Sequence, residues 1–237
     1  MRTLTRKGAA TRQRILDGAA AHIREYGVAA TALDDVLART ATSKSQLFHY
    51  FPGGREELLL AVARLEADRV LEDQQPQLGE LTSWPAWRSW RDKVVDRYRR
   101  QGRLCPLNAV TSQLGGATPG AQAVVTELMR RWQAEIATGV RHMQAAGEID
   151  PALDPDRAAA ALLAGIQGGV LIQMSTGETT HLEAALDMGI AHLRVRPRTA
   201  DDDRGGGAAE REAPPDPHGA GGVWPQRPEI RSGAEGS

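Results

Sequence analysis

A chain of 237 residues with 41% hydrophobic and 25% charged residues has the composition of a soluble globular protein with one large or two small domains. It contains no run of about 18 apolar residues, and its basic N-terminus lacks the apolar stretch of a secretion signal, so we expect no membrane as a partner. A single cysteine excludes an internal disulfide framework and indicates a cytoplasmic protein. The net charge of −1 would by itself argue against nucleic acid as a partner.

Charge is unevenly distributed along the chain. Residues 1–50 carry eight Lys and Arg against four Asp and Glu, whereas residues 199–237 carry four Arg against eight acidic residues. A locally positive end suits phosphate binding, because each neutralised phosphate releases counterions. The N-terminal part is therefore a candidate for contact with nucleic acid.

The first predicted helix runs from about Ala9 to Tyr26 and stops at Gly27, a residue that favours helix termination. Its apolar residues recur at the spacing of one helix face and are expected to be buried: Ile15, Leu16, Ala19, Ala20 and Ile23.

Residues 27–51, GVAATALDDVLARTATSKSQLFHYF, contain two short helical patterns with almost nothing between them. Thr31 with Asp34 predicts the start of the first helix. Ser43 with Gln46 forms a capping box, in which the Ser43 hydroxyl accepts the Gln46 backbone N–H and the Gln46 side chain accepts the Ser43 backbone N–H. Two helices about a turn apart predict a helix-turn-helix, whose second helix has the right size for a DNA major groove.

The surface of that second helix is polar and basic. We predict Lys44 as a phosphate contact, His49 and Tyr50 as phosphate or sugar contacts, and Gln46 as a contact to a base edge such as adenine. The full set of predicted DNA-binding residues is Thr31, Thr42, Ser43, Lys44, Ser45, Gln46, Phe48, His49 and Tyr50. The alternative is that they are ordinary solvated residues of a small helical subdomain.

The rest of the chain reads as further helices with no alternating strand pattern. Pro52-Gly53-Gly54 separates the predicted head from helices that cover about 55–75, 84 through 98, 107–114, 119–146, 155–174 and 180–194. Ser83 before Trp84-Pro85 and Asp154 before Pro155 predict two helix starts, and Thr180 with Glu183 predicts another capping box. From about Pro197 the chain cannot bury enough apolar surface to offset its ordering entropy, so a disordered tail is predicted. The predicted domains are 1–52, 53–195 and the tail 196–237.

Three segments in order, RQRILDGAAAHIREYG, SKSQLFHYF and P-x-x-(R/K)-E-E-L, span roughly Thr11 to Leu60 and resemble the tetracycline-repressor (TetR) family of transcriptional regulators. The resemblance implies an all-α fold of about nine helices, with a three-helix helix-turn-helix head and a C-terminal ligand-binding and dimerisation domain. The chain departs from the family at four positions: Leu37, Ala41, Ser45 and Phe48. A left-handed turn at Ala41 would cost about 1 kcal/mol without the usual glycine, and Phe48 lacks the hydroxyl of the usual tyrosine.

The helix DRAAAALLAGIQGGVLIQM repeats glycine at Gly165, Gly168 and Gly169. Glycine weakens helices, so its repetition indicates close backbone approach. One explanation is tight packing inside the monomer. The resemblance favours a four-helix dimer interface, with these predicted residues: Leu162, Ile166, Gly169, Ile172, Leu186, Ile190 and Leu193. A twofold dimer would place two reading helices on a palindromic operator.

The resemblance also implies that the body binds a small effector that releases DNA. Aromatic, Met and polar residues supply the candidates: Trp87, Trp90, Tyr98, Cys105, Gln113, Met129, Trp132, His142, Met143 and Gln167. We expect an apolar, aromatic ligand, although such residues are more often plain core. Cys105 is either a reactive thiol near Arg103 or, as we favour, a small buried hydrophobe.

Catalysis finds little support in the sequence. The six histidines show no metal-ligand spacing and no phosphate-cradling loop is present, so we predict no enzyme, no cofactor and no metal. The predicted function is a dimeric repressor that a small apolar effector releases from a palindromic operator. The alternative, motivated by Ala41, Ser45 and Phe48, is a helical ligand-binding or scaffold protein with a vestigial helix-turn-helix head.

Overall fold

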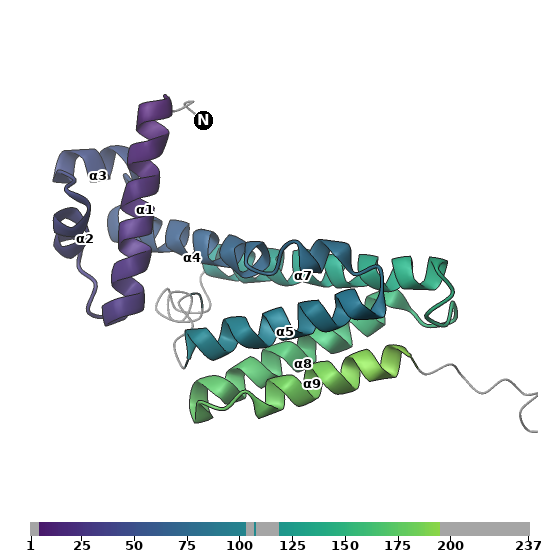
Figure 1. The fold of residues 1–237 in the computed structure, drawn as a ribbon. Coiled ribbons are helices and arrows are strands. Elements are labelled where there is room, and N and C mark those ends of the chain that lie inside the picture. Colours follow the sequence, from purple (N-terminus) through teal and green to yellow (C-terminus); the bar gives the residue numbers. More distant parts are fainter. Residues whose placement is uncertain (1–4, 103–106, 108–118, 195–237) are drawn as a thin grey trace, which may run out of the picture. The chain divides into compact units, whose positions relative to one another are not determined.

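The computed structural model describes residues 5–102, 107 and 119–194. Within these residues the fold is all-α, as predicted, and no strand occurs. The elements are α1 (Arg6–Tyr26), α2 (Leu33–Thr40), α3 (Lys44–Tyr50), α4 (Gly54–Glu72), the 3₁₀ turn η1 (Gln77–Glu80), α5 (Trp84–Gln101), α7 (Pro119–Ala145), α8 (Pro155–Thr176) and α9 (Thr180–Leu193) (Figure 1). The predicted helix 107–114, apart from Leu107, and the predicted tail lie outside the described residues.

Helices α1, α2 and α3 form the head, and α1 packs on both α2 and α4. The predicted α1 stripe is buried, and Val36, Leu47 and Phe51 have no exposed surface. α1 and α2 approach closely at Gly18, where an added Cβ would lie 2.2 Å from the Thr40 methyl carbon. The side chain of Thr40 therefore fills the space that a larger residue at Gly18 would need.

Several helix starts follow their predicted signals. The Ser43 box is present, Ser83 accepts the Ala86 N–H at 3.4 Å before α5, and Asp154 accepts the Asp156 N–H at 2.9 Å before α8. Helix α1 begins at Arg6, three residues earlier than predicted, because Thr5 accepts the Gly8 N–H.

Two predicted caps are wrong. Helix α2 begins after Ala32, whose N–H is accepted by Asp35 at 3.0 Å, because the Thr31 hydroxyl instead donates to the Gly27 carbonyl at 2.7 Å. Helix α9 begins after Thr179, and the hydroxyl of Thr179 donates to Glu183 at 2.6 Å. In both cases the capping residue lies one position away from the predicted one, and for α2 the Thr31 hydroxyl serves the Gly27 carbonyl instead.

The body is built from α5, α7, α8 and α9, and α4 runs from the head alongside α7 (Figure 1). Its core contains Trp87, Trp90, Trp132 and Met143, which have no exposed surface. Of the described helices only α8 is long and apolar enough to cross a membrane by length and composition. It packs against α7 and α9, as a core helix of the body does.

Candidate functional site

Helix α3 is the most exposed polar element of the head. Leu47 and Phe51 anchor it in the core, while Lys44, Ser45 and His49 are exposed. Phe48 is 39% exposed and Tyr50 is half-buried. The helix carries no acidic residue, so an anionic ligand would meet no carboxylate on it.

A reciprocal capping box fixes the start of α3. The Gln46 backbone N–H donates to the Ser43 hydroxyl at 3.2 Å, and the Ser43 backbone N–H donates to the Gln46 amide oxygen Oε1 at 3.1 Å. The polar side chains of Ser43 and Gln46 are therefore both engaged by the backbone. The Gln46 amide nitrogen Nε2 has no hydrogen-bond partner within the part of the chain that the structure describes.

The turn between α2 and α3 contains the strained residue that the sequence indicates. Ala41 has φ 46° and ψ 48°, which is the left-handed region, and it is the only described non-glycine residue with positive φ. The turn still closes, because the Thr42 N–H donates to the Leu37 carbonyl at 3.1 Å. An alanine at this position costs about 1 kcal/mol relative to glycine.

Two of the predicted contact residues face inward. Thr31 is 5% exposed and Thr42 is 7% exposed. The Thr31 hydroxyl donates to Gly27 and also contacts His22, while the Thr42 hydroxyl is hydrogen-bonded with Thr40. Direct DNA contact by these two side chains is therefore not supported by their positions.

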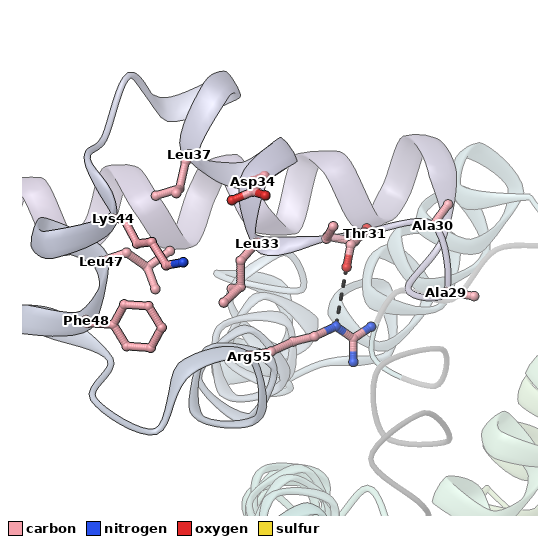
Figure 2. Close-up of a pocket in the computed structure, with 11 residues that line it drawn as sticks. Ala29, Ala30, Thr31, Leu33, Asp34, Leu37, Lys44, Leu47, Phe48 and Arg55 are labelled. Carbon is pink, nitrogen blue, oxygen red and sulfur yellow. Dashed lines mark hydrogen bonds between the residues drawn. The ribbon is translucent and has the colours of Figure 1, made fainter.

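A groove of about 690 Å³ runs beside α3, between the α1–α2 loop, α2 and the start of α4 (Figure 2). Phe48 and Leu33 line its middle, with Lys44 and Arg55 as its cationic side chains. Arg55 donates to the Val28 carbonyl at 2.9 Å and to the Thr31 carbonyl at 3.4 Å. Sequence reasoning missed Arg55, whose partners are backbone atoms 24 and 27 residues away.

Ion pairs join α1 to α4. Glu66 is only 5% exposed and receives Arg24 at 2.6 Å and Arg69 at 2.7 Å. Arg69 also reaches Asp17 on α1 at 2.8 Å. Together with Arg55 at the start of α4, these contacts tie both halves of α4 to the head.

The structure places most of the predicted dimer residues inside a single chain. Those buried within the protomer are Leu162, Ile166, Gly169, Leu186, Ile190 and Leu193, and only Ile172, at 37%, is exposed. An added Cβ on Gly169 would lie 2.5 Å from the Leu182 Cα, so this glycine serves the contact between α8 and α9. The exposed apolar surface of these helices comes instead from Leu171, at 63%, and Met188, at 72%. The six buried residues are already covered by their own chain, and their place in a dimer interface stays a prediction.

The predicted effector residues fall into four groups. Trp87, Trp90, Tyr98, Trp132 and Met143 are buried, Met129 and Gln167 are half-buried, His142 is exposed, and Cys105 and Gln113 lie outside the described residues. His142 lies at the surface rather than among the buried candidates, and its contact with an effector stays a prediction. Trp90 donates to Gln74 at 2.9 Å and so has a structural partner.

Six buried polar side-chain atoms lack a partner within the described ranges, and among them are the indole nitrogens of Trp87 and Trp132 and Oε1 of Gln173. Gln173 is 1% exposed, and its amide nitrogen donates to the Tyr98 carbonyl at 2.5 Å. An unpaired buried polar atom costs about 1–3 kcal/mol. Sequence reasoning missed Gln173, since the helix pattern around it is apolar and small.

No group of three or more His, Cys, Asp or Glu side chains that could hold a metal ion occurs among residues 5–102, 107 and 119–194. The ionisable groups whose pKa departs from its ordinary value belong to ion pairs or hydrogen bonds at the surface. An example is Glu183, whose pKa is lowered by the Thr179 hydroxyl and by Arg91 and Arg99.

Comparison with known proteins gives two family matches in chain order. Residues 15–62 match the family model of bacterial regulatory proteins of the tetR family, and residues 86–188 match that of the tetracyclin repressor-like C-terminal domain. The first match covers most of the head and part of α4. The second covers α5 to α9, so both parts of the fold have the same family assignment.

Among individual proteins, the chain is 33% identical over 110 residues to an uncharacterized HTH-type transcriptional regulator of Mycobacterium tuberculosis H37Rv, covering 44% of this chain and about half, 53%, of that relative. It is 26% identical over 156 residues to the transcriptional regulator AcuR of Cereibacter sphaeroides, covering 63% of this chain and 70% of AcuR. A TetR transcriptional regulator from Chloroflexus aurantiacus has a similar crystal structure, with a TM-score of 0.65 and 27% identity over 80% of this chain and 96% of that one. The chain belongs to the TetR family of bacterial regulatory proteins.

Proposed function

We propose that this protein is a sequence-specific DNA-binding transcriptional regulator, most simply a repressor. The observation that carries the proposal is α3, a capped helix without acidic residues that presents Lys44, Ser45 and His49 outward. A helix of this kind fits the major groove, where side chains reach base edges. Two copies of it in one assembly would read the two halves of a palindromic operator.

The second copy of the chain is proposed to cover the exposed apolar residues of α8 and α9. Leu171 and Met188 are more exposed than any other large hydrophobic described residue, and Ile172 lies beside Leu171 in the sequence. Gly168 leaves open space, with no atom within 4 Å of an added Cβ. Burial of this apolar surface against its twofold copy would stabilise a dimer by removing it from water.

The dimer surface is tested by replacing both Leu171 and Met188 with Glu. We expect sedimentation to give the mass of one chain instead of two, with helical content unchanged, because both side chains are exposed within the protomer. Tyr26→Glu is the control, since Tyr26 is 56% exposed but lies on α1. A double variant that keeps the mass of two chains would refute this dimer surface.

A small, mainly apolar effector is proposed to bind in the body. The indole nitrogens of Trp87 and Trp132 and Oε1 of Gln173 are buried without partners in the described part. A ligand that offers hydrogen-bond acceptors to the indoles and a donor to Gln173 would remove the cost of leaving them unpaired. Because α4 is tied to the head by Arg55, Glu66 and Arg69, a shift of α4 would carry the head with it. A coupling of about 1–3 kcal/mol would lower DNA affinity about 5- to 150-fold.

DNA binding is tested with a palindromic fragment from the region upstream of the coding sequence, challenged with excess random DNA. We expect the specific complex to survive the competitor and to weaken with salt. Lys44→Ala is expected to reduce the slope of log affinity against log salt by about 1. Equal affinity for every sequence would favour the alternative, a ligand-binding or scaffold protein with a vestigial head. The effector proposal is tested by adding members of a compound pool to the specific protein–DNA complex and measuring whether DNA is released. The same measurement on Trp132→Phe tests whether that side chain takes part in the response.

A further inference from the structure

The capping box of α3 uses one half of a side chain that would otherwise be free to read DNA. Glutamine has an acceptor, Oε1, and a two-proton donor, Nε2. Here Oε1 of Gln46 accepts the Ser43 N–H at 3.1 Å. This bond uses one of the two lone pairs of Oε1 and holds that atom at the helix start, so Nε2 is the amide atom left without a partner in the described part of the chain.

The orientation of the Gln46 amide follows from the chemistry of its partner. Amide oxygen and nitrogen are similar in shape, so their assignment rests on their hydrogen bonds. The backbone N–H of Ser43 can only donate, so the atom opposite it must be the acceptor Oε1. Reversing the amide would place two donors against each other and break the reciprocal box.

No other side chain of α3 offers a carboxylate that could accept a hydrogen bond from a base in place of Gln46 Oε1. The helix KSQLFHY has no Asp or Glu, and the exposed Lys44 side chain can only donate. The recognition surface is therefore biased toward hydrogen-bond donors.

Each base pair shows a different pattern in the major groove. Adenine presents an acceptor beside a donor, and a glutamine reads it with both halves of its amide. Guanine presents two adjacent acceptors, N7 and O6, and thymine presents one acceptor beside a methyl group. The two protons of a single NH₂ group match the paired acceptors of guanine.

We propose that Gln46 is a specificity-determining residue that reads guanine through Nε2, and that adenine is disfavoured at the same position. This inference rests on the proposed DNA-binding function and replaces the expectation of an adenine contact. The amide oxygen keeps its place in the capping box while the nitrogen contacts the base, so one side chain both starts the helix and reads the operator.

The experiment begins with selection of binding sites from a random duplex library by the full-length protein. Each guanine of the selected half-site is then replaced in turn by 7-deazaguanine, which lacks the N7 acceptor. Each adenine is replaced by 7-deazaadenine as the matched base control. Affinities are measured for the wild-type protein and for Gln46→Glu.

Gln46→Glu is the informative variant because glutamate also closes a capping box but has no amide donor. We expect its thermal unfolding midpoint to stay at the wild-type value. Its added negative charge weakens binding to every duplex by a similar factor. The coupling between residue 46 and a base is therefore measured as the difference between the two proteins in the affinity lost when that base is replaced.

We expect one guanine in each half-site at which 7-deazaguanine lowers wild-type affinity about 5-fold, the typical effect of one hydrogen bond. At that position Gln46→Glu should show no further loss, whereas at the other guanines both proteins should respond equally. Coupling to an adenine, or to no guanine at all, would overturn the guanine assignment while leaving the regulator function intact. A selection that returns no consensus would overturn both.

Discussion

The head and the body of this protein are held together by different kinds of contact. In the head, hydroxyl groups of Thr31, Thr40 and Ser43 close loops and caps, and charged side chains join α1 to α4. In the body, tryptophans fill the core, and glycines allow α8 and α9 to approach until backbone lies near backbone. Polar contacts depend on direction and on pH or salt, whereas close apolar packing depends on volume. The two regions should therefore respond to different substitutions.

The largest effect is expected for Gly169→Ala in the body. The added Cβ would lie 2.5 Å from the Leu182 Cα, and backbone cannot move aside as a side chain does. We expect a loss of about 3 kcal/mol in the free energy of unfolding, measured with denaturant. The control is Gly168→Ala, where nothing lies within 4 Å and helix propensity favours Ala by about 1 kcal/mol. Equal destabilisation by both variants would contradict the packing difference between the two glycines.

The next largest effect is expected for the ion pairs that join α1 to α4. Glu66→Ala removes a carboxylate that is 5% exposed and leaves Arg24 and Arg69 without it. Loss of one partner from a buried ion pair costs about 3–5 kcal/mol, but these arginines are partly exposed, so we expect about 2 kcal/mol. Glu25→Ala removes an exposed pair with Arg39 and should cost much less than Glu66→Ala, because exposed ion pairs contribute little to stability. If the two losses match, burial of Glu66 does not strengthen the junction.

A stabilising change is expected in the turn of the head. Ala41→Gly places glycine at φ 46° and should raise the free energy of unfolding by about 1 kcal/mol, because the left-handed conformation then carries no Cβ penalty. Ala38→Gly, in the exposed interior of α2, should lower it by a similar amount. Thermal unfolding of the two variants measures both changes. A lower free energy of unfolding in both variants would mean that the turn is not left-handed.

The smallest effect concerns the surface charges of the body. The Thr179 hydroxyl, with Arg91 and Arg99, lowers the pKa of Glu183 from its ordinary value of 4.5. Since the folded pKa is lowered, the stabilisation is present above about pH 4.5 and is lost as the pH falls through the folded value. The stabilisation contributed by charged Glu183 should stay below about 0.5 kcal/mol, as is usual for ion pairs at the surface. The difference in unfolding midpoint between wild type and Glu183→Gln should therefore disappear on going from pH 6 to pH 3, and a difference that grows would reverse this assignment.

The same contrast explains which features could be predicted from the sequence. The Ser43–Gln46 box, the Ser83 and Asp154 caps and the turn at Ala41 depend on residues a few positions apart, and the structure contains all of them. Thr31 and Thr180 matched the same local patterns, but the Thr31 hydroxyl serves the Gly27 carbonyl, and the Glu183 carboxylate accepts from Thr179 rather than Thr180, so both helix starts differ by one residue.

Contacts between distant segments could not be predicted from local spacing. Periodicity identified Leu186 and Ile190 as apolar positions, yet it did not indicate whether their own chain or a partner covers them. Arg55 and Gln173 bind backbone carbonyls supplied by other elements, and no residue pattern marks a carbonyl. For the same reason the exposed face of Leu171 and Met188 was missed, since side-chain direction on a helix becomes meaningful only when its neighbours are known.

The engagement of Gln46 by its own helix start limits how this protein could change its operator. If Gln46 reads a base as proposed, a substitution there would alter the base that is read and the stability of the reading helix together, unless the new side chain also accepts the Ser43 N–H. Variants with a new preference would thus be drawn from a short set of residues or would need compensating changes elsewhere in the head. On that proposal, operator choice at this position would be constrained by folding as well as by recognition.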